Sequence, residues 1–168
     1  MVREDVIAAL AVIKIAFPYS YKDVSREQAE HVIALWCDIF ADYDPAPVLM
    51  AVKTIIASDT NQFPPSIGRV RTEADQIITL IKSLGSMGYT IFEYMGDKAK
   101  KYPLSVRKQI TQSSKAAYRR IYGREFISNA ERLQLPIGNA QENITTLKGA
   151  LIGEDTRQYL GDSSKVQG

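Results

Sequence analysis

Residues 36–76 contain three apolar stretches separated by two proline-marked junctions, and this pattern constrains the fold more than any other. At the first junction Asp44-Pro45 is typical of a helix N-cap followed by a first-turn proline. The second junction is Phe-Pro-Pro-Ser at 63–66, where proline disfavours helix in the residue before it and serine caps the helix that follows. These junctions predict helices over about 45–57 and from residue 66 onward, with Phe63 plugged into the core.

Hydrophobic periodicity predicts two further helices in the first half of the chain. One covers about 3–17 and ends at Pro18, and the other starts at Ser25, which forms a capping-box pair with Gln28. The side chains expected to face inward are Val6, Ile7, Leu10, Ile13 and Phe17; Val32, Leu35, Trp36, Ile39 and Phe40; Val48, Leu49, Val52, Ile55 and Ile56; and Ile67, Val70, Ala74, Ile77, Ile78 and Ile81. Four helices with short connections predict a compact bundle over 1–84, in which Trp36 meets Phe63.

The pattern changes after residue 84, where glycines at 85, 88 and 96 indicate a hinge or linker over 85–104 with a short helical turn. A basic amphipathic helical region is expected over 105–136, with Ser105 as a cap and Gly123 weakening its middle by about 1 kcal/mol relative to alanine. Residues 137–168 are too polar to offset the entropy cost of ordering, so a largely flexible, partly disordered tail is expected. The predicted fold class is therefore all-α.

Charge is distributed unequally between the two halves. Residues 1–84 carry 8 Lys and Arg against 11 Asp and Glu, a net charge of −3, whereas residues 85–168 carry 13 against 8, a net charge of +5. Residues 98–124 hold nine cations and no acidic residue. Such a stretch attracts phosphates or an acidic protein surface.

Three aromatic residues recur at four-residue intervals within and just beyond this basic stretch, and four cations border them. This apolar stripe with a cationic border is typical of a helix that docks into a groove of a protein partner. Three alternatives stay open: a solvated face, internal core of the second half, or a surface that stacks on single-stranded nucleic acid. The candidate partner-binding residues are Lys115, Tyr118, Arg119, Arg120, Tyr122, Arg124 and Phe126.

Residue types needed for catalysis or for metal binding are scarce. Cys37 is the only cysteine and His31 the only histidine, so neither an intrachain disulfide nor the usual four-ligand zinc set is available, and Cys37 is expected in the core. A phosphate-loop signature is absent, and the Ser-x-x-Lys spacing at 105–108 lacks its companion motifs. We therefore expect a protein that is not an enzyme and binds no cofactor. No stretch approaches the roughly 20 apolar residues of a membrane span, so a soluble, cytoplasmic protein is expected.

Several of these segments occur in an order that resembles a known family. Over about residues 2–81 the chain resembles the N-terminal domain of bacteriophage replicative-helicase loader and inhibitor proteins, and residues 118–122 and 130–136 look like the closing stretch of longer members. The segments that carry the N-terminal resemblance are Ala16-Phe17-Pro18, the helix bearing Trp36, Ala41-Asp42-Tyr43-Asp44, Ala51-Val52-Lys53 and Phe63-Pro64-Pro65-Ser66-Ile67.

This resemblance implies a phage DNA-replication adaptor located in the host cytoplasm. Such a protein binds the ring-shaped hexameric replicative helicase, restrains its ATP hydrolysis and delivers it to an origin-bound initiator protein. It also implies a folded helical N-terminal domain and a mobile C-terminal part that reaches the helicase. Two alternatives stay open: a phage nucleic-acid-binding protein that uses residues 98–124, and a helical virion assembly or scaffold factor.

Overall fold

All regular elements in the described part of the chain are helices. The computed structural model describes residues 1–58 and 63–128, so the predicted tail at 137–168 and the end of the helical region predicted over 105–136 lie outside the described residues. The all-α prediction is confirmed. In chain order the elements are α1 (Arg3–Ala16), the 3₁₀ helix η1 (Pro18–Tyr21), α2 (Arg26–Ile39), α3 (Pro45–Ser58), α4 (Ile67–Met87), α5 (Ile91–Met95), the 3₁₀ helix η2 (Gly96–Lys101) and α6 (Leu104–Tyr122).

Local capping bonds explain where the helices of the first half begin. At α2 the Ser25 hydroxyl accepts from the Gln28 amide at 3.1 Å, and the Ser25 amide donates to the Gln28 side chain at 2.9 Å, which confirms the predicted capping box. At α4 the Ser66 hydroxyl accepts from the Arg69 amide at 3.3 Å, as predicted. Helix α3 begins at Pro45, also as predicted.

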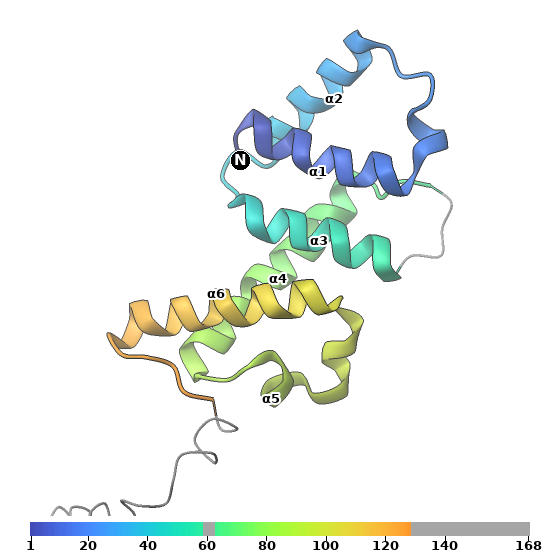
Figure 1. Cartoon of the computed structure of the whole chain (residues 1–168). Helices are drawn as coiled ribbons and strands as arrows, with labels where there is room; N and C mark the ends of the chain where they lie inside the picture. Colours follow the sequence, from blue (N-terminus) through green and yellow to red (C-terminus); the bar gives the residue numbers. More distant parts are fainter. Residues whose placement is uncertain (59–62, 129–168) are drawn as a thin grey trace, which may run out of the picture. The chain divides into compact units, whose positions relative to one another are not determined.

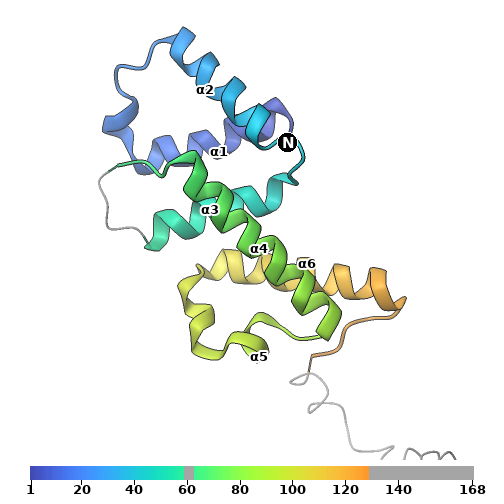
Figure 2. The same cartoon turned by 180° about the vertical axis from the view of Figure 1, so that it is seen from behind.

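The helices pack in an order that follows the chain, as Figures 1 and 2 show. Helix α1 packs on α3, α3 on α4, and α4 on α6, while α2 packs mainly against α1. Residues 1–128 form one compact unit. A single core of buried side chains runs through it, from Val6 and Ile13 of α1 through Val52 of α3 and Ile77 of α4 to Ile110 of α6.

The predicted boundary at residue 84 falls within α4. This helix continues to Met87 and ends at Gly88, which adopts the left-handed conformation (φ 69°) and donates its amide to the Leu84 carbonyl at 2.9 Å. The segment predicted as a hinge, 85–104, contains the end of α4, then α5 and η2, and it buries Ile91, Ala99 and Tyr102 in the common core. Independent folding of 1–84 stays a prediction.

The prediction that Phe63 plugs the core is wrong. Its side chain is 77% exposed, and the buried residue of this proline segment is Pro65. Trp36 is buried, but it packs against Phe40 one helical turn later, with ring centroids 5.3 Å apart, and Phe40 contacts Tyr43 at the same separation. The tryptophan thus has an aromatic partner in its own segment, because residues four apart lie on one helix face.

Two further core assignments are wrong, and several buried residues escaped prediction. Leu35 and Ile7 are substantially exposed, whereas α3 buries Met50, Ala51 and Thr54 in addition to its predicted face. The reason is position: α3 lies between α1 and α4 and therefore buries two faces, while a periodicity argument provides for one.

The basic helix is shorter than predicted. Helix α6 ends at Tyr122, and Gly123 (φ 65°) donates its amide to the Arg119 carbonyl at 2.8 Å. Gly123 therefore terminates the helix rather than weakening its middle, because glycine tolerates the left-handed conformation of a helix C-terminus. The N-cap is Pro103, so Ser105 lies in the first turn and does not cap the helix.

Candidate protein-binding surfaces

The residues predicted to bind a partner cluster at the C-terminal end of α6, but they do not form one continuous helical stripe. Because α6 ends at Tyr122, the chain reverses at Gly123 and brings Phe126 back onto Tyr118, with ring centroids 5.4 Å apart in an edge-to-face arrangement. Both side chains are only 7% exposed. A Cβ atom added at Gly88 would lie 2.9 Å from the Tyr118 ring, so these aromatics pack tightly against the end of α4.

The exposed aromatic of the set is Tyr122. Its ring is 4.6 Å from that of Tyr118, and its hydroxyl donates to the Ser86 carbonyl of α4 at 2.6 Å. Nearly half of its surface remains accessible, as does that of its neighbour Ile121. The aromatic group therefore has a buried layer that supports an exposed one.

The predicted cations surround this aromatic group. The Arg124 guanidinium donates to the Tyr118 hydroxyl at 3.2 Å and lies about 6 Å from the Tyr118 and Tyr122 ring centroids. The Lys115 ammonium lies 5.4 Å from the centre of the Phe126 ring, and Arg119 pairs with Glu125. We call the exposed members the α6 end surface: Lys115, Arg119, Arg120, Ile121, Tyr122 and Arg124.

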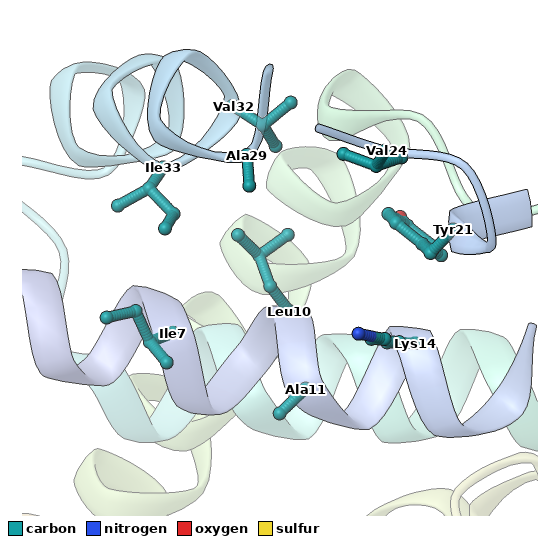
Figure 3. A pocket seen from close by; sticks show the side chains of 9 residues that line it. All are labelled: Ile7, Leu10, Ala11, Lys14, Tyr21, Val24, Ala29, Val32 and Ile33. Atoms are coloured by element: carbon teal, nitrogen blue, oxygen red, sulfur yellow. The ribbon is translucent and has the colours of Figure 1, made fainter. Parts of the chain in front are cut away.

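A second surface, the α1–α2 groove, was not recognised from the sequence. It has a volume of about 320 Å³ and lies between α1, α2 and the segment that connects them (Figure 3). Its lining is apolar apart from the Lys14 side chain and the Tyr21 hydroxyl. The lining residues are Ile7, Leu10, Ala11, Lys14, Tyr21, Val24, Ala29, Val32 and Ile33. The signal in the sequence was the unbroken apolar run at 6–13, which is more than one buried helix face requires.

The groove is held together at the end where α1 begins. Arg3 of α1 pairs with Glu30 of α2 at 2.6 Å, and this hydrogen bond raises the pKa of the Arg3 guanidinium. The Met1 ammonium donates to the carbonyls of Phe40, Ala41 and Tyr43 at 2.9, 2.9 and 3.0 Å. From this junction the two helices diverge, as both views of the ribbon show (Figures 1 and 2).

Tyr21 lies at the other end of the groove. Partial burial raises the pKa of its phenol. Its ring and the Val24 side chain line the groove beside Lys14 (Figure 3). The groove thus has one purely apolar end, near Ile7 and Ile33, and one end that carries a positive charge.

Neither surface has the arrangement of a metal or catalytic centre. Across residues 1–58 and 63–128, no group of three or more His, Cys, Asp or Glu side chains is placed to hold a metal ion. His31 is exposed on α2, and Cys37 is partly buried against the core. None of the helices in these ranges has both the length and the apolar character needed to cross a membrane. The two surfaces are suited to binding macromolecules.

Comparison with known proteins assigns the first part of the chain. No curated protein and no solved structure matches it. One family model matches, over residues 1–71, which comprise α1, α2, α3 and the beginning of α4. The α1–α2 groove lies within this part, and the α6 end surface lies outside it. Residues 1–71 belong to the family described as the N-terminal domain of the helicase loader and inhibitor of phage SPP1.

Proposed function

We propose that this protein is a phage DNA-replication adaptor that binds the replicative hexameric helicase, restrains its ATPase and helps to load it at an origin-bound initiator. The match of residues 1–71 to the N-terminal domain of the SPP1 loader and inhibitor carries this proposal. The adaptor would act in the host cytoplasm and would hydrolyse no nucleotide itself. It would need no cofactor, since its contribution is binding energy alone.

Such an adaptor restrains the helicase by preferring one of its conformations. A ligand shifts a conformational equilibrium only by the difference between its affinities for the two states. If the adaptor binds best to a helicase ring that hydrolyses ATP slowly, helicase bound to the adaptor remains inactive. By reciprocity, an initiator or DNA strand that favours the active ring weakens adaptor binding and releases the helicase.

The α6 end surface is our choice for the helicase contact. Arginine and tyrosine are enriched among the residues that dominate protein interfaces, and this surface presents Arg120 and Tyr122 side by side with further cations. Tyr118 and Phe126 would contribute indirectly, because their buried rings position Tyr122 and Arg124. The positive surface would face an acidic region of the helicase.

The direct test measures helicase binding and helicase ATPase rate with the full chain and with Arg120→Ala. Loss of a central interface residue costs more than about 1 kcal/mol, so Arg120→Ala should weaken binding by about fivefold or more. Arg26→Ala removes an exposed cation from α2 and serves as the matched control, which should bind as the unmodified chain does. The proposal fails if the full chain neither binds the helicase nor lowers its ATPase rate. A pull-down from host extract without helicase would favour the virion scaffold alternative.

A truncated chain tests the division of labour. Fragment 1–84 contains the whole matched region but lacks α6, so it should fold and yet leave the helicase ATPase rate unchanged. Circular dichroism of the fragment checks the first expectation and an ATPase assay the second. If the fragment inhibits as well as the full chain, the helicase contact lies in the N-terminal region instead.

Nucleic-acid binding is the second candidate, and a cationic groove along α6 favours it. This groove has a volume of about 290 Å³ and carries three cations and no carboxylate. Its lining residues are Phe92, Leu104, Arg107, Lys108, Thr111, Gln112 and Lys115. The Arg107 guanidinium lies 5.0 Å from the centre of the exposed Phe92 ring, an arrangement on which a base could stack.

Salt dependence separates the two functions. Phosphate contacts release counterions, so the logarithm of DNA affinity should fall with the logarithm of salt by roughly 0.7 to 0.9 per neutralised phosphate. Titrating labelled single- and double-stranded DNA at several salt concentrations measures this slope. Tight, steeply salt-dependent DNA binding without helicase binding would replace the adaptor proposal.

A further inference from the structure

We propose that the α1–α2 groove docks one amphipathic helix of a protein partner, and that a carboxylate on this helix pairs with Lys14. This inference goes beyond the helicase contact, since the groove lies in residues 1–33 and the α6 end surface in residues 115–124. It makes the protein an adaptor with two separate docking surfaces.

The first argument is that α1 and α2 do not close on one another. The two helices are joined where α1 begins, through the Arg3–Glu30 ion pair, but further along their facing side chains remain accessible. Ile7 is 43% exposed and Val24 39%, while Leu10, Val32 and Ile33 are only partly buried. Figure 3 shows Leu10 and Ala29 directed into the space between the helices. An apolar surface of this kind loses less free energy to water when a partner covers it.

The second argument concerns the size and shape of the space. The lining residues of α1 run from Ile7 to Lys14, which is two helical turns, or about 10 Å at 1.5 Å per residue. Ala29, Val32 and Ile33 of α2 form the opposite wall. Two diverging helices present ridges on both sides, into which a third helix packs with side chains spaced at i, i+4 and i+7. A groove of about 320 Å³ accommodates several such side chains.

The third argument is charge. Lys14 is the only charged residue in the lining, and within the described residues it forms no ion pair. It lies at the Tyr21 end of the groove (Figure 3). An ammonium beside apolar surface favours a carboxylate and disfavours a cation on any occupant. The partner helix should therefore carry Asp or Glu within one turn of its apolar residues, and this charge should fix the direction in which the helix lies.

Selection from a random library of 16-residue displayed peptides on the immobilised full chain tests the proposal. Enriched peptides should place apolar residues at i, i+4 and i+7 with an adjacent Asp or Glu. Ala29→Trp fills the groove from α2 and should reduce the affinity of selected peptides at least tenfold. Ala34→Trp introduces the same side chain at an exposed position of α2 outside the groove and should leave the affinity unchanged.

Lys14→Glu provides the test of charge. On this variant the selection should enrich Lys or Arg where the unmodified chain enriches Asp or Glu. Lys22→Glu, which changes an exposed lysine outside the lining, should keep the acidic preference. If Ala29→Trp does not fold, as judged by circular dichroism, Ile7→Gln replaces it, because Ile7 is already partly exposed.

Four results would overturn the proposal: no enriched peptide, peptides that bind Ala29→Trp as tightly as the unmodified chain, peptides without an acidic preference, or a self-association of the chain that Ala29→Trp abolishes. Sedimentation of the full chain detects the last, which would make a second copy the occupant. Restraint of the helicase ATPase by Ala29→Trp should be unchanged, so failure of this proposal is distinguishable from failure of the proposed function.

Discussion

Two helix pairs in this protein meet in opposite ways. Helices α4 and α6 approach so closely that a Cβ atom added at Gly85 would lie 2.7 Å from the Ala117 Cβ atom and 3.3 Å from the Ser114 carbonyl oxygen. Helices α1 and α2 instead diverge and leave an apolar groove of about 320 Å³. Small residues alone do not explain the difference, because Ala11 and Ala29 line the open groove.

The connecting segments explain it better. Between α4 and α6, residues 88–103 bury Ile91, Ala99 and Tyr102 in the common core and thereby tie the two helices together. Between α1 and α2, residues 17–25 contribute no fully buried side chain; Phe17 and Tyr21 are only partly covered. Whether a pair of neighbouring helices closes therefore depends on what the chain between them can bury.

The largest effect is expected at the junction of the N-terminal helices. Trp36→Ala should lower the free energy of unfolding by about 3–5 kcal/mol, because truncating a buried aromatic residue leaves a cavity and removes its contact with Phe40. Thermal and denaturant unfolding measure the loss. Leu35→Ala, at an adjacent residue that is 52% exposed, is the control and should cost far less.

This prediction can also break the comparison. If Trp36→Ala left the melting curve intact but abolished binding of helicase or initiator, Trp36 would be an interface anchor and not a packing residue. The N-terminal helices would then lack a tightly packed junction.

The close approach of α4 and α6 predicts a second, smaller effect. Gly85→Ala should destabilise the protein by about 1–3 kcal/mol, because the methyl group overlaps Ala117 and the α6 backbone. Gly68→Ala, in the first turn of the same helix, has open space around its Cβ position and should stabilise the protein by up to about 1 kcal/mol. Chemical denaturation of both variants checks the contrast. Equal effects would mean that the helices are not in close contact at Gly85.

Phe63→Ala is expected to change stability by less than about 0.5 kcal/mol, since its side chain is mostly in solvent. A thermal melt beside that of Trp36→Ala measures the difference between the two aromatic residues. A loss of several kcal/mol at Phe63 would restore it to the core and place a packed aromatic beneath the α3–α4 connection.

The smallest effect concerns Tyr21 at the charged end of the groove. Burial raises the pKa of its phenol, so folding favours the neutral form. The resulting stability is fully present below the unfolded pKa of about 10 and is lost as pH rises through the higher folded value. Denaturation at pH 7 and at pH 11 should show less alkaline destabilisation for Tyr21→Phe than for the unmodified chain. An identical loss in both would mean that Tyr21 is solvated.

The candidate surfaces were predictable only in part. The cations of the α6 end surface could be identified from sequence, because exposed charge is the default for Lys and Arg. Burial of Tyr118 and Phe126 could not, since it depends on contact with Gly88 of α4 and on the reversal of the chain at Gly123. A left-handed helix end at Gly123 was available as a local signal, and using it would have shortened the predicted helix.

By itself, the sequence determined the features that depend on near neighbours along the chain. The capping bonds at Ser25 and Ser66 and the start of α3 at Pro45 arise within a few residues, so they follow from local stereochemistry. The tertiary structure alone decided that Phe63 is exposed, that α3 is buried on two faces and that α1 and α2 diverge. These outcomes depend on which helices compete for the same apolar surface, and that competition involves residues far apart in the chain.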